Sequence, residues 1–184
     1  QVANRSDFAV VPVEGFNPTR LKAFKEGIEK TIGAKILSAV IFDRDYRSEN
    51  EINSEKKELA KNNYFVHIHS CKEIENFLIV PSAIQKAIIE KISENNKRQN
   101  KSAFLKEEIN SLLSSISDEF RLKTQAQLQT HQKKKKKSKD PKSQESILIE
   151  NIFKEYEKNW NNLEHRFKMI PGKDFLSALN TYLQ

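Results

Sequence analysis

Short apolar runs that stop abruptly at acidic residues constrain the fold of this chain most strongly. The run from Phe8 to Val13 ends at Glu14-Gly15, and the run from Ile36 to Phe42 ends at Asp43-Arg44-Asp45. Both runs are rich in β-branched residues, as are strands that are buried on both faces of a sheet. We therefore predict two strands here, each with acidic side chains at its carboxyl end.

Helical periodicity separates these predicted strands. Leucine, phenylalanine and isoleucine recur at helical spacing between Pro18 and Gly33. A short helix is expected within 47–63, and the apolar run Tyr64–Ile68 predicts a third strand. Strands that alternate with helices favour a parallel sheet, in which ligand sites lie beyond the carboxyl ends of the strands. The predicted fold class is therefore α/β.

After Pro81 the pattern is helical only. Apolar stripes predict helices over 82–92, 104–128, 149–167 and 174–183. The stretch 132–144 contains a run of lysines that cannot pack together, so it is predicted to be a disordered loop. We expect residues 1–81 and 168–184 to form the α/β core and 82–167 to form a helical insertion.

The charge of the chain limits its partners. Its 184 residues include 32 Lys+Arg and 25 Asp+Glu, a formal net charge of +7, which favours an acidic polymer or an anionic surface as partner.

The sequence also excludes several kinds of protein. The single cysteine, Cys71, excludes an intramolecular disulfide and a cysteine-rich zinc site. The chain has no apolar run of membrane-spanning length and no secretory signal pattern, so we expect a cytoplasmic protein without membrane contact. Because it begins at Gln1, we expect it to be part of a longer protein.

The acidic residues at the two strand ends are candidate ligands of a metal ion. Asp43 and Asp45 are two residues apart, so they point to one side of an extended backbone. Glu14 joins them if the two strands are neighbours, as consecutive parallel strands usually are. Carboxylate oxygens suit Mg²⁺, and paired ions stabilise both oxygens of a phosphodiester displacement. The alternative is that the aspartates begin a solvated turn and that Glu14 caps a helix.

The ordered pair of motifs, VEG after one apolar run and FDRD after the next, resembles the TOPRIM domain. Three local patterns, FDRDYR, KEIENFLIVP and IPGKDFLSAL, resemble the carboxyl-terminal nuclease region of the overcoming-lysogenization-defect (OLD) family and related ATPase-linked nucleases of phage defence. The resemblance covers Phe8–Pro81 and Met169–Leu183. It implies a Rossmann-like parallel sheet flanked by helices, with an inserted α-helical subdomain.

The resemblance also implies an activity, a divalent-metal-dependent endonuclease that nicks or cuts DNA. The implied ligands of one or two Mg²⁺ or Mn²⁺ ions are Glu14, Asp43, Asp45 and Glu75, and the implied catalytic residues are the first three of these with Lys173. One acidic ligand of the family pattern EGxxD is missing, because Gly15 is followed by Phe-Asn-Pro. The full-length protein would carry an ABC-type ATPase on its amino-terminal side, through which it could form a homo-oligomer.

Several of these residues also have ordinary structural interpretations. Glu75 could be a helix residue that interacts favourably with the helix dipole, and Lys173 could be a solvated loop lysine. Arg44 and Arg47 flank the acidic pair, where they could contact a scissile phosphate or balance its charge. The lysines Lys133, Lys134 and Lys135 could bind the phosphate backbone of a nucleic acid or be solvated.

Two other functions compete with a nuclease. A vestigial TOPRIM module would bind nucleic acid or a protein partner without cutting, and the missing EGxxD acid keeps this alternative open. A phospho-accepting receiver domain also has acidic strand ends and a late lysine. It requires an aspartate after a middle strand, whereas the third predicted strand here ends in His69-Ser70-Cys71.

Overall fold

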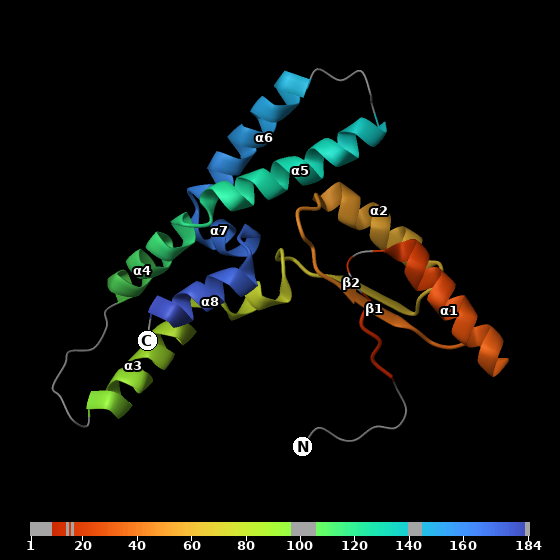
Figure 1. Ribbon diagram of the computed structural model, residues 1–184, viewed down its shortest axis with the longest axis horizontal. Coiled ribbons are helices and arrows are strands. Elements are labelled where there is room, and N and C mark those ends of the chain that lie inside the picture. Colours follow the sequence, from red (N-terminus) through yellow and green to blue (C-terminus); the bar gives the residue numbers. More distant parts are fainter. Residues whose placement is uncertain (1–8, 14, 16, 97–105, 140–144, 183–184) are drawn as a thin grey trace. The chain divides into compact units, whose positions relative to one another are not determined.

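A computed structural model describes residues 9–13, 15, 17–96, 106–139 and 145–182. Over these residues the chain is mainly helical, with eight α-helices, one 3-10 helix and two short strands (Figure 1). It divides into two compact units, one made of Gln1–Phe42 with Asn53–Ile68 and the other of Asp43–Ile52 with His69–Gln184. Each unit is described separately.

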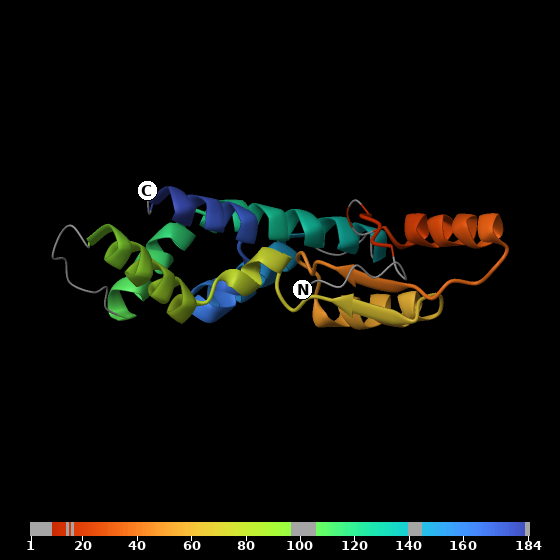
Figure 2. The ribbon, with the colours of Figure 1, turned by 90° about the horizontal axis from the view of Figure 1, so that it is seen from below.

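The first unit contains a two-stranded parallel sheet (Figure 2). β1 (Ala39–Phe42) pairs with β2 (Phe65–Ile68) in a register that places Phe42 opposite Ile68. The helix α2 (Glu49–Ala60) connects the two strands, and its residues up to Ile52 belong to the second unit. Val40, Phe42 and Ile68 are buried, so one side of this small sheet is covered.

The helix α1 (Pro18–Ile32) begins and ends where the sequence predicts. The side chain of Asn17 accepts a hydrogen bond from the backbone N of Arg20 at 3.0 Å. Pro18 occupies the first turn, where a missing N–H leaves no helical hydrogen bond unmade. Gly33, with φ 70°, ends the helix in the left-handed conformation that glycine adopts most easily.

The predicted α/β architecture, a parallel sheet flanked by helices, is wrong. The strands predicted within 36–42 and 64–68 are present, but residues 9–13 form no strand, and the described residues contain only a two-stranded sheet. Pro12 gives a physical reason, because proline has no N–H to donate to a neighbouring strand. Val10 is also 81% exposed, so this run is not the buried strand that its composition indicates. A Rossmann-like TOPRIM sheet is therefore not formed by the described residues.

The second unit is a helical assembly. Its elements in chain order, apart from the start of α2, are η1 (Ile74–Leu78), α3 (Pro81–Asn96), α4 (Lys106–Asp118), α5 (Arg121–Lys139), α6 (Glu145–Trp160), α7 (Leu163–Met169) and α8 (Gly172–Tyr182). Large side chains from several of these helices share one core, among them Ile109, Leu113, Tyr156, Trp160, Ile170 and Phe175. The helical stripes predicted from the sequence therefore supply this core, as their spacing indicates.

Two predicted helices, 104–128 and 149–167, are each interrupted, giving α4 and α5 and then α6 and α7. The buried side chain of Arg166 stabilises both interruptions. Its Nε donates to the carbonyl O of Trp160 at 2.8 Å, at the end of α6, and its Nη1 donates to Asp118 Oδ1 at 3.0 Å, at the end of α4. A buried arginine needs such acceptors, so the helix ends and the arginine satisfy one another.

The lysine-rich stretch 132–144, which we predict to be a disordered loop, is helical as far as Lys139 because α5 continues through it. Residues 140–144 lie outside the described part of the chain. Lysine is a good helix former, and repulsion between solvated lysines costs only tenths of a kcal/mol per pair. The division into a core of 1–81 with 168–184 and an insertion of 82–167 stays a prediction.

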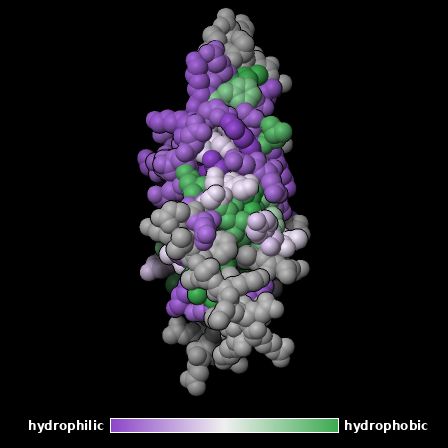
Figure 3. All heavy atoms as spheres, turned by 90° about the vertical axis from the view of Figure 1, so that its left-hand side faces the viewer, coloured by the Kyte–Doolittle hydropathy of each residue, from purple (hydrophilic) through white to green (hydrophobic). Residues whose placement is uncertain are grey.

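On the face shown in Figure 3, hydrophilic side chains dominate the upper half, with smaller apolar areas among them. This distribution matches the low mean hydropathy of the chain, −0.71. Over the described residues, none of the helices has both the length and the apolar character needed to cross a bilayer.

Candidate functional site

The loop that follows β1 holds the two candidate aspartates, Asp43 and Asp45. Asp45 has φ 50°, an unusual value for a residue other than glycine, and its backbone N donates to the carbonyl O of Lys72 at 2.9 Å. The buried Arg47 donates from Nη1 to the carbonyl oxygens of Asp43 and Arg44, at 3.2 and 3.0 Å, and to Asp45 Oδ2 at 2.9 Å. Arg47 therefore holds the loop together from inside.

Asn76 connects the segment after β2 to the end of α7. Its side-chain oxygen accepts from the backbone N of Glu73 at 2.8 Å. Its side-chain nitrogen donates to the carbonyl oxygens of Phe167 and Ile170 at 2.7 and 3.0 Å. Asn76 is 5% exposed, so these three bonds are made away from water and hold η1 firmly against α7.

Glu73 stabilises the beginning of α8. Its Oε2 accepts a hydrogen bond from the backbone N of Lys173 at 3.1 Å, and its Oε1 is bonded to the buried ammonium of Lys72. A carboxylate is favoured at a helix N-terminus, because the first N–H groups there have no partner within the helix. The backbone N–H of Lys173 therefore already has an acceptor. Its side chain is exposed and makes no hydrogen bond or ion pair to any described residue.

One cavity of about 340 Å³ brings these segments together. It lies entirely in the second unit and is lined by Asp43, Asp45, Glu73, Glu75, Lys173 and Asp174. We call it the acidic pocket. Four of the residues that the sequence and the resemblance point to, Asp43, Asp45, Glu75 and Lys173, thus line one pocket although they come from three distant segments.

The acidic pocket perturbs the titration of Asp43. Partial desolvation raises the pKa of its carboxyl above the ordinary value, and the negative charges of Asp45 and Glu75 act in the same direction. A Coulombic interaction with His69 and a hydrogen bond from the backbone N of Ile74, 3.0 Å from Asp43 Oδ1, oppose this rise only in part. The negative charge on Asp43 is therefore poorly compensated in the free protein.

The carboxylates of the acidic pocket differ in how far they are neutralised. Asp45 is paired with Arg47 and Glu73 with Lys72, and Asp174 Oδ2 lies 2.5 Å from Lys123 Nζ. Asp43 and Glu75 have no ion-pair partner among the described residues. These two carboxylates are therefore the ones that remain available to an added cation.

This donor set fits a divalent metal ion by its chemistry. Mg²⁺ prefers oxygen ligands and typically takes one or two carboxylates, with water and substrate phosphates as its other ligands. Asp43 and Glu75 supply that number. Within the described part of the chain, no group of three or more histidine, cysteine, aspartate or glutamate side chains converges as a preformed metal site. A fully protein-built metal cage is thus not present there.

The remaining predicted site residues lie elsewhere. Glu14 and the side chains of Lys134 and Lys135 are outside the described residues, whereas Lys133 is half-buried on α5. Arg44 pairs with Glu49 at 2.7 Å and donates from Nε to the carbonyl O of Arg47 at 3.0 Å. Its guanidinium is therefore partly engaged within the loop.

Sequence reasoning misses two members of the acidic pocket. Asp174 is not among the predicted site residues, although it directly follows Lys173 in the first turn of α8. In the sequence, Glu73 has the position of a residue that interacts with the dipole of its own helical segment. In the structure it accepts a hydrogen bond from the backbone of α8, one hundred positions later. The one signal in the sequence that could have identified either residue is the position of Asp174 in the first turn of a predicted helix.

Comparison of the chain with models of protein families, with curated proteins and with solved structures finds no match. The resemblance to TOPRIM and OLD nucleases therefore depends on the local motifs alone. Any functional assignment must be argued from the acidic pocket.

Proposed function

We propose that this chain is a divalent-metal-dependent endonuclease that hydrolyses phosphodiester bonds in DNA. One observation carries the proposal, namely that Asp43, Glu75 and Lys173 line the same pocket. A pair of carboxylates that form no ion pair with a described residue within 4 Å, beside an unpaired ammonium, suits a metal ion on one side and a phosphate on the other. The net charge of +7 supports an anionic polymer as substrate.

Within this proposal each residue has a separate task. Asp43 and Glu75 would hold one Mg²⁺ or Mn²⁺ ion, and Glu14 and Asp45 are the further candidates for a second. A bound ion of this kind polarises the phosphate and lowers the pKa of a coordinated water. The Lys173 ammonium would pair with the negative charge that builds up on the phosphate. Arg47 and Asn76 keep the segments that carry these groups in position.

The wider assignment follows from the resemblance of the three motifs. It places the chain in the carboxyl-terminal part of an OLD-like ATPase-nuclease of phage defence, with an ABC-type ATPase as neighbouring domain, a homo-oligomer formed through it and a cytoplasmic location. These remain predictions. The second candidate function is a module that binds nucleic acid or a protein partner without cutting, and the absence of a converged three-ligand metal group among the described residues favours it.

Cleavage of supercoiled plasmid DNA separates the two candidates. With Mg²⁺ or Mn²⁺ the chain should nick or linearise the plasmid, and excess EDTA should stop the reaction. Replacing Asp43→Asn together with Glu75→Gln should reduce the rate at least ~10²-fold while DNA binding is retained, because lysines and arginines supply most of that affinity.

The matched control is Glu150→Gln, an exposed carboxylate that pairs with Lys154. It changes the net charge in the same sense but lies outside the acidic pocket, so the cleavage rate should not change. Metal-independent retention of DNA without nicking would contradict the proposal and support the binding module. Equal activity of the double variant and the wild type would also contradict it.

A further inference from the structure

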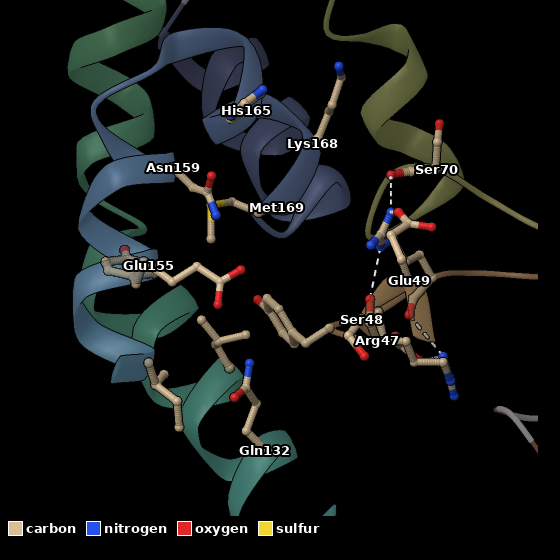
Figure 4. A pocket seen from close by; sticks show the side chains of 16 residues that line it. Arg47, Ser48, Glu49, Ser70, Gln132, Glu155, Asn159, His165, Lys168 and Met169 are labelled. Carbon is tan, nitrogen blue, oxygen red and sulfur yellow. Dashed lines mark hydrogen bonds and ion pairs between the residues drawn. The ribbon is translucent and has the colours of Figure 1, made fainter. Parts of the chain in front are cut away.

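A second cavity, of about 430 Å³, lies beside the acidic pocket within the same unit. Asp45 lines both cavities, so the two are adjacent. We call the larger one the side pocket. It is open to solvent on one side and is lined by the loop from Arg44 to Glu49 and by parts of α5, α6 and α7 (Figure 4). A volume of this size lies in the range of small-molecule sites.

The walls of the side pocket combine apolar and polar surface. Tyr46, Leu128 and Met169 supply an aromatic ring, an aliphatic group and a thioether. The ring of Tyr46 is fixed in place, because its OH donates to Gln127 Oε1 at 2.9 Å and the Lys72 ammonium lies 5.4 Å from its ring centroid. A flat apolar ligand would therefore meet a rigid aromatic surface.

Three polar side chains of the side pocket have no hydrogen-bond partner among the described residues: Gln132, Glu155 and Asn159. Glu155 and Asn159 are four residues apart on α6 and project together toward the cavity, and Gln132 approaches it from α5 (Figure 4). Two amides and one carboxylate thus offer both donors and acceptors to a ligand. Basic side chains, Arg44, His165 and Lys168, also line the pocket.

We propose that the side pocket binds the nucleobase next to the scissile phosphate, turned out of its stack, and that it prefers bases with an exocyclic amino group. Bases stack on aromatic side chains, and asparagine or glutamine recognises adenine while a carboxylate accepts from the amino group of cytosine. Thymine offers no amino group to Glu155. This proposal rests on the proposed nuclease function, since the adjacent acidic pocket would act on the phosphate attached to that nucleotide.

Equilibrium binding of free nucleotides tests the proposal without catalysis. The whole chain is titrated calorimetrically in EDTA with dAMP, dCMP, TMP and inorganic phosphate. dAMP and dCMP should bind at least about fivefold more tightly than TMP and at least about tenfold more tightly than phosphate, as one good base contact allows. Equal affinity for all four would show an anion site without base recognition and would overturn the proposal.

Two substitutions identify the pocket. Glu155→Met should remove the preference for dCMP over TMP, and Asn159→Leu should weaken dAMP binding at least about tenfold. Asn161→Leu is the matched control, because Asn161 is exposed just beyond α6 and does not line the pocket, so it should bind dAMP as the wild type does. Thermal unfolding of each variant checks that the fold is kept. Wild-type nucleotide preference in folded Glu155→Met and Asn159→Leu proteins would overturn the assignment.

Failure of this inference is distinguishable from failure of the nuclease proposal. Asp43→Asn with Glu75→Gln leaves the side pocket intact, so this variant should bind dAMP normally while losing cleavage. Cleavage by the wild type whose sequence preference is unchanged in Glu155→Met would overturn the base pocket and leave the nuclease standing. Nucleotide binding in a wild type that never cuts DNA would overturn the nuclease proposal.

Discussion

Lys173 combines an occupied backbone with an unpaired side chain. Its N–H is bonded to Glu73, whereas its ammonium lines the acidic pocket without a partner among the described residues. Lys173→Met keeps the N–H and most of the side-chain volume and removes only the charge. Single-turnover cleavage should therefore fall by roughly 10² to 10³-fold, the effect of losing one preorganised electrostatic group.

The thermal unfolding midpoint of Lys173→Met should stay within error of the wild type, because the ammonium makes no hydrogen bond or ion pair to a described residue. Lys154→Met is the control, since that exposed lysine pairs with Glu150 and lines neither the acidic pocket nor the side pocket. If Lys173→Met cuts DNA at the wild-type rate, the lysine is a solvated surface residue.

Asp43 should make the stability of the metal-free protein depend on pH. Because its pKa is raised in the folded state, folding favours the protonated carboxyl, and the resulting stabilisation is present below the unfolded pKa of about 4 and lost as pH rises through the folded pKa. Asp43→Asn removes this loss and still accepts the bond from Ile74. The variant should be more stable than the wild type at pH 7 in EDTA, and the difference should shrink toward about pH 3.

For Glu150→Gln we expect the opposite pH dependence of stability. A hydrogen bond from Lys154 lowers the pKa of the Glu150 carboxyl, so that residue contributes stability above its unfolded pKa and loses it as pH falls. Denaturant unfolding of both variants across this pH range measures the two trends. A wild type that is at least as stable as Asp43→Asn at pH 7 would contradict the electrostatic description of the acidic pocket.

At the scale of elements, η1 and α8 approach each other closely beside the acidic pocket, at Gly172 and Asn76. A Cβ on Gly172 would lie 2.8 Å from both the backbone N and the Oδ1 of Asn76. Neither atom can move freely, because Asn76 is buried and bonded to Glu73 and to the end of α7. Glycine is required here for close approach of two elements.

Gly172→Ala should therefore destabilise the protein by about 1–3 kcal/mol, the usual cost of overpacking, and should reduce cleavage because η1 carries Glu75. Gly27→Ala is the matched control. A Cβ there meets nothing within 4 Å in the middle of α1, so the change should stabilise the protein by about 0.5–1 kcal/mol. Denaturant unfolding measures both, and equal stabilisation by the two alanines would contradict the proposed close contact.

For the whole molecule, the lysine run on α5 should dominate binding to DNA. Replacing Lys133, Lys134 and Lys135 by alanine keeps a strong helix former at each position and removes three positive charges. The dependence of log K on log salt should become shallower by about 0.9 for each phosphate that these lysines no longer neutralise. Fluorescence anisotropy of a labelled duplex over a salt series measures this slope.

A triple replacement of the exposed lysines Lys22, Lys86 and Lys154, which changes the net charge equally, is the control. If both triple variants shift the salt dependence by the same amount, the net charge of the molecule sets its affinity and the lysine run has no special part. A shift confined to the α5 variant supports localised binding of phosphates.

Local patterns predict the helices and two of the strands because they depend on neighbours in sequence. The apolar spacing that ends at Gly33 is a property of α1 alone, and the change from apolar to acidic residues at Asp43 marks the end of β1. The strand predicted near Val10 is wrong because a strand needs a partner, and nothing in its own composition supplies one. The two helix breaks cannot be predicted from local patterns, because they are stabilised by a distant side chain. The buried Arg166 donates to the carbonyl O of Trp160 and to the carboxylate of Asp118 at these helix ends.

The sequence by itself determined which residue types are available for chemistry: acidic groups after β1, an acidic segment after β2 and a lysine at the start of α8. Only the tertiary structure decided their tasks. Glu73 and Glu75 belong to one short acidic segment, yet Glu73 is bonded to Lys72 and to the backbone of Lys173, whereas Glu75 has neither kind of partner among the described residues. The physical reason is that a carboxylate's charge is available to a ligand only when no neighbouring donor neutralises it, and those donors come from parts of the chain up to one hundred residues away.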